Sequence, residues 1–398
     1  MLRVRPHRRT SWRASRALAI GWGETERSAH RETVGIGDKV LFALAIGLAL
    51  SGVVMVYSAS AVLAAERYGT QYHFLARQAL WMLLAFAAML VTMRVDYHLY
   101  QHPRLVAALL VGTGALLMAV FFFPAVNGAH RWIRWGSLSF QPSELARLAL
   151  IIFLAAHLDR RIPAGIKRFN LTFLPCALVA GVMMALVALE PDLGMALSLG
   201  LILLVMFFIV GVPVRHQVWL GVGVLPLLVW LVVRVNWRWE RILAYIDPWQ
   251  DPRGSGFQAI QSLIALGSGG ITGVGFAQGK QKLFFLPEPH TDFIFAHIGE
   301  ELGLVGTGLL ALAFGLFLWR GMRIAWQAPD TFGTLLGAGI VTAIVAQALF
   351  HMSVAVGLFP VKGTPLPLIS YGGSSLVITM AAIGVLLNIA QQARPDDV

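Results

Sequence analysis

Ten apolar runs, separated by short polar segments, dominate the chain from residue 40 onward. They lie at about 40 to 60, 75 to 93, 105 to 124, 143 to 157, 171 to 189, 193 to 211, 217 to 233, 293 to 319, 332 to 357 and 371 to 390. A helix of about 20 apolar residues crosses the hydrocarbon layer of a bilayer, and most of these runs approach that length. The pattern therefore predicts an all-α, polytopic integral membrane protein with about ten transmembrane helices.

The basic residues between the runs indicate an orientation. With the N-terminus inside, nine Lys and Arg residues fall in short cytoplasmic loops and five in the opposite short loops. This asymmetry predicts an N-in, C-in topology. We expect a disordered basic cytoplasmic tail at 1–37, a ten-helix transmembrane domain at 38–391 and a short cytoplasmic tail at 392–398. The one long loop, 234–292, lies between spans seven and eight and is predicted to be extracytoplasmic.

Composition and charge exclude several classes of protein. The 398 residues are 57% hydrophobic and 13% charged, whereas soluble domains have about 25% charged residues. The net charge of +11 comes from basic residues dispersed between spans, so we expect no nucleic-acid partner. The chain has no P-loop, no zinc-protease or serine-hydrolase motif and only one cysteine, so neither nucleotide hydrolysis nor a Cys/His metal site is predicted.

The stretch from Gly269 to Gly303 carries the densest polar chemistry. A glycine-rich loop leads through Lys280, Lys282, Glu288 and His290 to Asp292 and a long apolar run. Ionisable groups at membrane depth cost about 2.5 to 3.5 kcal/mol each, so several together indicate a functional site. The alternative is that Asp292 only caps the helix that follows.

Helical periodicity adds an expectation about that helix. If it begins at His290 and Asp292, then Ala296, Gly299 and Gly303 lie on the face of Asp292 and let another helix or a substrate approach. On this reckoning Glu301 lies on the opposite face, away from Asp292.

Three further segments at predicted outer ends carry polar groups. Glu144 and Arg147 are spaced for an ion pair, although Arg147 also suits a phosphate. For Glu190 and Asp192 three alternatives stay open: a simple helix-breaking turn, binding of a divalent cation, or pairing with an arginine from elsewhere in the chain. Prolines break the helix near 360–375, and non-helical backbone at membrane depth implies a cavity that is buried in protein or reached by water. The candidate binding residues there are Lys362, Ser370, Ser374 and Ser375. An amphipathic helix at about 257–267 is predicted to support the site.

These clusters share one side of the membrane, and we expect them to meet in one cavity. Cations, hydroxyls and a helix-mounted carboxylate suit the phosphate-bearing headgroup of a lipid. Because broken helices and intramembrane charges also occur in transporters, a lipid transporter is the alternative, although no chain of acids crosses to the cytoplasmic side.

Long strings in the chain resemble the SEDS family (shape, elongation, division and sporulation), which includes the bacterial FtsW and RodA proteins. The resemblance covers residues 38 to 390, and its strings are VMVYSAS, RWI with QPSELA, EPDLG, GFQAIQSLIALGSGG, QKLFFLPEPHTDFIFAHIGEELG and KGTPLPLISYGGSS. The forms IGEELG and KGTPLPLISYGGSS are more similar to the FtsW division type than to the RodA elongation type.

The resemblance implies a peptidoglycan glycosyltransferase that polymerises lipid II on the outer face of the bacterial plasma membrane, at the division site. It implies that Asp292 assists deprotonation of the acceptor sugar's 4-hydroxyl, with inversion and release of undecaprenyl pyrophosphate held by cationic residues. Burial would raise the pKa of Asp292, and Lys280 or Lys282 would lower it.

The resemblance also implies partners. They are a cognate class B penicillin-binding protein, which is a transpeptidase, and other division proteins. No cofactor is assigned, although a divalent cation, Mg²⁺ or Mn²⁺, near Asp192 or Asp292 is an open possibility. The alternatives within and beside the family are a RodA-type elongation polymerase, a lipid II flippase and a non-catalytic division scaffold.

Overall fold

The computed structural model describes residues 37–125, 128–136, 138–162, 165–166, 168–283 and 285–393. The predicted N-terminal tail lies outside these residues except for Gly37, and so do the last five residues of the predicted C-terminal tail.

Ten long helices make up the described part of the chain. They are α2 (Lys39–Tyr68), α3 (His73–Arg94), α4 (Pro103–Ala119), α5 (Pro142–Arg161), α6 (Leu174–Leu189), α7 (Leu193–Val210), α8 (Val214–Val233), α11 (Ile294–Trp326), α12 (Thr331–Ala355) and α13 (Gly373–Gln392). Nine of these segments are long and apolar enough to cross a membrane. The tenth, α5, has 20 residues and carries charges at both of its ends. The prediction of about ten spans is confirmed.

Short elements join the long helices. They are η1 (Tyr97–Gln101), η2 (Val120–Phe122), η3 (Phe169–Phe173), α9 (Asn236–Ile246), η4 (Pro248–Gln250), α10 (Phe257–Gly269) and the strands β1 (Ile133–Trp135) and β2 (Leu138–Phe140). The two strands form an antiparallel hairpin with Arg134 opposite Ser139, a small exception to the all-α prediction. The predicted outer loop at 234–292 contains α9, η4 and α10.

Local capping explains where several helices begin. Asp38 accepts a hydrogen bond from Leu41 N at the start of α2, and Asp330 accepts one from Gly333 N at the start of α12. Such side chains satisfy amide groups that the first helical turn leaves free. Gly69 and Gly211 end α2 and α7 in the left-handed conformation that glycine adopts without strain.

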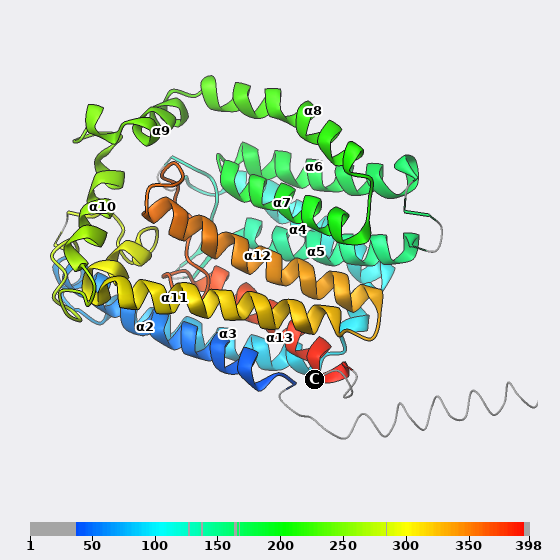
Figure 1. Ribbon diagram of the computed structural model, residues 1–398, viewed down its shortest axis with the longest axis horizontal. Helices are drawn as coiled ribbons and strands as arrows, with labels where there is room; N and C mark the ends of the chain where they lie inside the picture. The colour runs from blue at the N-terminus through cyan, green and yellow to red at the C-terminus, as the bar shows by residue number, and fades with distance from the viewer. Residues whose placement is uncertain are drawn as a thin grey trace, which may run out of the picture.

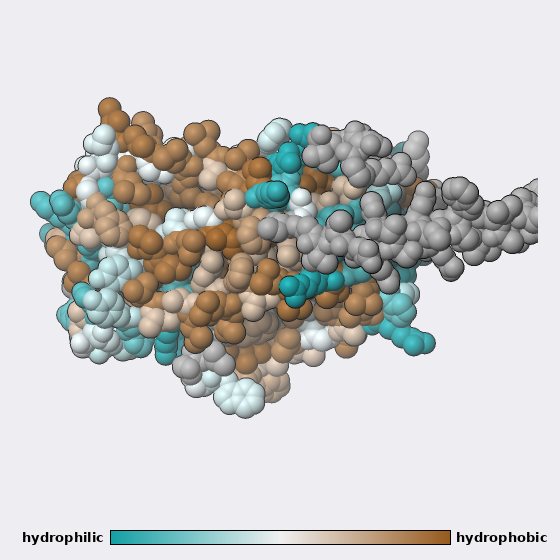
Figure 2. Space-filling view, turned by 90° about the horizontal axis from the view of Figure 1, so that it is seen from below, coloured by the Kyte–Doolittle hydropathy of each residue, from teal (hydrophilic) through white to brown (hydrophobic). Residues whose placement is uncertain are grey.

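The long helices lie side by side, and α9 and α10 lie at one end of the bundle (Figure 1). The described ends of the chain meet at the opposite end, because a Cβ on Gly37 would lie 2.7 Å from Leu387 O. Both ends on one face agree with the predicted N-in, C-in topology. Seen from below, hydrophobic residues form a broad band with hydrophilic residues gathered toward its ends (Figure 2), as expected for a protein surrounded by lipid.

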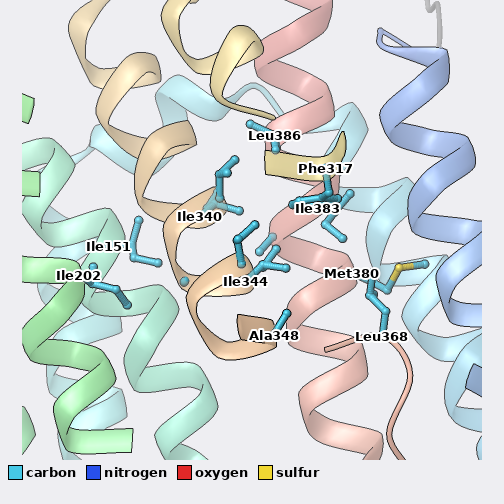
Figure 3. Packing of buried hydrophobic residues seen from close by; sticks show 14 of the residues in the cluster. Ile151, Ile202, Phe317, Ile340, Ile344, Ala348, Leu368, Met380, Ile383 and Leu386 are labelled. Carbon is cyan, nitrogen blue, oxygen red and sulfur yellow. The ribbon is translucent and has the colours of Figure 1, made fainter. Parts of the chain in front are cut away.

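Helix α12 lies at the centre of the core. It packs against α5, α7, α11 and α13, and Ile340, Ile344 and Ala348 project from it between its neighbours (Figure 3). By contrast, α8 has no buried residue at all and arches along the outside of the bundle (Figure 1).

Helix α11 is interrupted near its outer end. Gly303 leaves the helical conformation with φ 67° and ψ −162°. The segment that follows α10 replaces the interrupted bonds, because Leu304 N donates to Gly270 O at 2.9 Å and Val305 N donates to Ile271 O at 3.1 Å. In return, Val274 N and Gly275 N donate to the carbonyls of Glu300 and Glu301. The broken helix is therefore joined to the loop by backbone pairing.

Candidate active site

Asp292 lies in a turn just before α11. The helix begins at Ile294, and its N-cap position is Phe293, which makes no side-chain capping bond. Both expectations about this helix are therefore wrong: Asp292 neither opens it nor caps it. The proline at 289 and the bond from Asp292 N to Glu288 O keep the preceding backbone in a turn, and Asp292 is left free for other contacts.

The predicted stripe of small residues is only partly confirmed. Gly299 admits α10, because a Cβ on Gly269 would lie 1.9 Å from Gly299 O. Gly303 does not continue the stripe, since the helix is interrupted there. The predicted amphipathic helix is α10, which packs against α11 and buries Ile260, Ala265 and Gly269, with Gly269 and Leu266 beside Gly299.

Two bonds from the segment before α13 fix the backbone beside Asp292. Tyr371 N donates to His290 O at 2.9 Å, and Ser370 Oγ donates to Thr291 O at 2.7 Å. Ser370 also accepts a bond from Leu366 N. The hydroxyl of Ser370, predicted to bind substrate, therefore holds the loop that carries Asp292.

The carboxylate of Asp292 is partly buried and lies close to the 362–365 loop. A Cβ on Gly363 would come within 2.6 Å of Asp292 Oδ2. The pKa of Asp292 is raised to about 6, because burial and, after it, the charge of Glu288 raise it more than Arg241, Arg131 and Lys362 lower it. The expectation that Lys280 or Lys282 lowers this pKa is wrong, because the neighbouring cations come from α9, from the segment just before β1 and from the 362–365 loop.

Lys362 pairs with Asp192. Its Nζ lies 3.4 Å from Asp192 Oδ1 and 5.6 Å from the centre of the Phe350 ring. Burial lowers the pKa of Lys362 and the charge of Asp192 raises it. Asp192 also caps α7 by accepting from Met195 N. Asp192 thus receives a cation from elsewhere in the chain, although this cation is a lysine and not the predicted arginine.

Arg131 holds the same turn through its backbone. Its guanidinium donates to the carbonyl of Glu190 at 3.1 Å and to the carbonyl of Pro191. The carboxyl group of Glu190 is buried, and neither of its oxygens has a hydrogen-bond partner among the described residues. Burial and the charge of Asp192 together raise the pKa of Glu190 to about 8, although Arg131 lowers it. Glu190 is therefore protonated at neutral pH and adds no negative charge to the site.

The predicted pair of Glu144 and Arg147 forms inside the bundle. Arg147 Nη2 lies 2.5 Å from Glu144 Oε2, and the guanidinium also bonds to Gln347. Gln347 in turn donates to Pro365 O at 2.8 Å. The ion-pair alternative is confirmed, and the pair lies behind the loop that carries Lys362. Binding of phosphate by Arg147 stays a prediction and requires the side chain to leave these partners.

Lys282 lies in a different cluster. Its Nζ is 2.8 Å from Glu301 Oε1, and the two side chains are 7% and 0% exposed. Lys280 is exposed, and its backbone amide donates to Glu300 Oε1 at 2.7 Å. The expectation that all three polar clusters meet in one cavity is wrong in this respect, because Lys282 is paired away from Asp292.

The remaining candidate residues have mainly packing contacts. Ser374 Oγ accepts from Gln141 N at 3.3 Å, and Ser375 is buried beside it on α13.

The ring of His290 packs 4.7 Å from Phe74 and 5.7 Å from Tyr371. Burial lowers the pKa of His290 to about 4, so this side chain is neutral at pH 7. Glu288 is half exposed, 3.7 Å from His290.

Several residues of the site were not predicted. Arg131 and Arg241 belong to segments far from Asp292 in sequence, and only the fold brings them beside it. Gln347, in the middle of an apolar helix, gave the one usable signal, because an amide at membrane depth needs a partner.

Within the described residues no three His, Cys, Asp or Glu side chains are grouped to hold a metal ion, so a divalent cation stays a prediction and would need oxygen ligands from the substrate.

The comparisons with known proteins decide the family. The sequence profile of the FtsW/RodA/SpoVE family, described as cell cycle proteins, matches residues 38–395. The chain belongs to this family. It is 44% identical over 360 residues to a probable peptidoglycan glycosyltransferase FtsW of Geobacter metallireducens, a match that covers 90% of this chain and 95% of the relative. It is 41% identical to the stage V sporulation protein E of Bacillus subtilis over 361 residues, which are 90% of this chain and 98% of the relative.

Solved structures agree in fold. A chain of a peptidoglycan synthase complex, described as coordinating polymerisation and crosslinking, superposes with a TM-score of 0.72 at 32% identity and covers 89% of this chain and 97% of its own. The rod-shape-determining protein RodA of Thermus thermophilus superposes with a TM-score of 0.66 at 30% identity, covering 90% and 98% of the two chains. This family member is therefore a multi-pass membrane enzyme, a peptidoglycan glycosyltransferase, as its sequence predicted.

Proposed function

We propose that this glycosyltransferase polymerises lipid II at the outer end of the bundle, with Asp292 as general base. One observation carries the proposal: a partly buried carboxylate with a pKa of about 6 is surrounded by Arg131, Arg241 and Lys362. A base whose pKa lies near the working pH transfers protons efficiently and typically supplies about 10² to 10⁴ in rate.

The reaction balances with these residues in these roles. Asp292 accepts the proton of the acceptor sugar's 4-hydroxyl as that oxygen attacks the anomeric carbon of the donor. The bond from the anomeric carbon to the pyrophosphate oxygen breaks with inversion, and undecaprenyl pyrophosphate leaves with the electron pair. Lys362, Arg131 and Arg241 stabilise the negative charge that develops on the leaving group.

The decisive experiment is lipid II polymerisation by the purified full chain with its cognate transpeptidase. We expect glycan strands from the wild type and none from a folded, partner-bound Asp292→Asn. The matched control is Glu240→Gln, which removes an exposed carboxylate of the same outer loop and should retain most activity.

The alternatives are outcomes of the same experiment. Equal polymerisation by wild type and Asp292→Asn would contradict the role of Asp292. Absence of polymer from both proteins, with lipid II translocation in vesicles, would favour the flippase, and absence of both activities would favour a scaffold.

We further propose a class B penicillin-binding protein as partner and the division site as the location, together with other division proteins. The synthase complex among the similar structures supports a crosslinking partner. The 44% identity to FtsW of Geobacter metallireducens, against 30% to RodA of Thermus thermophilus, supports the division type over an elongation-type polymerase. Co-purification with the transpeptidase and mid-cell fluorescence of a tagged full chain test it, and uniform fluorescence along the side wall would support the elongation type instead.

A further inference from the structure

A buried ionic cluster lies between α2, α11 and the loop that precedes Asp292. Glu301 Oε1 lies 2.8 Å from Lys282 Nζ, and both carboxylate oxygens accept from Ser58 Oγ, at 2.8 and 2.6 Å. The backbone amide of Ala277 donates to the same carboxylate at 3.0 Å. His297 Nε2 lies 3.3 Å from Glu301 Oε1. The cluster therefore connects two transmembrane helices to one loop.

The neighbouring acid anchors the same loop. Glu300 Oε1 accepts from the backbone amides of Lys280 at 2.7 Å and Gln281 at 3.2 Å. Together with the backbone pairs around Gly303, these bonds attach the chain from 270 to 282 to α11. The chain then runs directly on to Asp292.

The far end of this segment is also fixed. Tyr371 N and Ser370 Oγ bond to the carbonyls of His290 and Thr291. Asp292 thus lies on a short segment held at its start by Lys282 and at its end by the residues before α13. A shift at either anchor moves the carboxylate relative to Lys362 and Arg131.

We propose that Lys282 and Glu301 are positioning residues, which set the location of Asp292 without touching substrate. The proposal rests on the proposed role of Asp292. It assigns Lys282 a different role from the substrate binding predicted above, because its ammonium is directed to Glu301 and Ser58.

The energetics of buried ion pairs support a positioning role. Two charges removed from water gain little net stability from their attraction, whereas removal of one partner leaves an uncompensated charge. A misplacement of about 1 Å far from the chemistry can cost on the order of 10²-fold in rate. We therefore expect kcat to be more sensitive than substrate binding to loss of this pair.

The test is a double-mutant cycle on the full chain with its cognate transpeptidase. The variants are Lys282→Met, Glu301→Gln and the double variant, with Arg253→Met as control because Arg253 is an exposed cation of the same outer loop. We expect each single variant to lower kcat by about 10- to 100-fold while KM for lipid II changes less than threefold. The double variant should be no worse than the poorer single variant, since effects within one network are not additive.

Conservative variants separate positioning from folding. Lys282→Arg keeps the charge and should recover most of the activity. Ser58→Ala removes one hydrogen-bond donor to Glu301 without leaving an unpaired charge, so the protein should still fold and its kcat should fall severalfold.

Three results would overturn the proposal. If Lys282→Met had a raised KM for lipid II while Glu301→Gln had normal kinetics, Lys282 would be a substrate ligand. If the loss of kcat in the double variant equalled the product of the two single losses, the two residues would not be coupled. If the ionic variants do not fold, a fully active Ser58→Ala would show that the cluster serves stability alone. Activity in Asp292→Asn would instead refute the proposed function, which is a separate readout.

Discussion

Gly194 lies directly beneath the ammonium group of Lys362. A Cβ at this position would come 1.3 Å from Lys362 Nζ and 1.9 Å from its Cε. The absent side chain therefore creates the space in which Lys362 reaches Asp192.

Gly194→Ala is expected to displace Lys362 and impair catalysis. Removal of one group that stabilises the transition state typically lowers kcat by about 10² to 10³, and we expect a loss at the lower end because Arg131 and Arg241 remain. Polymerisation kinetics measure the effect. Gly181→Ala is the matched control, since nothing lies within 4 Å of its added Cβ, and an equal loss in both variants would contradict this account.

The pH dependence of polymerisation follows from the raised pKa of Asp292. The base form is the carboxylate, so kcat should rise with pH through about 6, where half of the groups have lost their proton. Above this range the rate should level off. A rate that stays constant from pH 5 to 7 would be inconsistent with Asp292 as base.

Glu190 predicts a pH-dependent stability. Its pKa is raised to about 8 in the folded protein, so the folded state retains a proton that the unfolded state loses above its ordinary pKa. Folding stability should therefore decline as pH rises from about 5 to 8. Glu190→Gln resembles the protonated form and should lose this decline, which melting temperatures measured across that range would reveal. Parallel melting curves for the two proteins would contradict the assignment.

The pairing of α11 with the loop at 270–275 depends on Gly303. A Cβ there would lie 2.4 Å from Gly273 N and from Ile271 O, in a backbone conformation with positive φ. Gly303→Ala should lower stability by at least about 1 to 3 kcal/mol from backbone strain, measured by thermal unfolding. Gly308→Ala, one turn further along the same helix with open space around it, should be neutral or stabilising because alanine exceeds glycine in helix propensity by about 1 kcal/mol.

The elements show what periodicity reveals and what it does not. The ten apolar runs predicted the spans because lipid demands continuous apolar length. The start of α11 was placed too early because Asp292 is a residue type that favours helix starts, and only its contacts exclude that role. The pair of Lys282 and Glu301 was missed because the loop reverses direction on α11, and a helical wheel cannot represent this reversal. The ion pair of Glu144 and Arg147 was predicted because both residues lie on one helix.

At the scale of the whole molecule, both described chain ends lie opposite the end that carries Asp292. A cysteine placed at exposed Asp251 should react with a membrane-impermeant maleimide in intact spheroplasts, whereas one at exposed Arg104 should react only after permeabilisation. The native Cys176 is buried in α6 and should give little background. Labelling of both sites in intact spheroplasts would contradict the N-in, C-in topology.

The backbone pairing around Gly303 also constrains how this chain can vary in length. The segment between that pairing and Asp292 has a fixed starting register and a fixed end point, so an inserted or deleted residue should shift Asp292 relative to its neighbours. Homologous chains are therefore expected to accept substitutions in this segment far more readily than changes in length. Elsewhere in the outer loop, for example around exposed residues 251–254, an insertion should leave the position of the carboxylate unchanged.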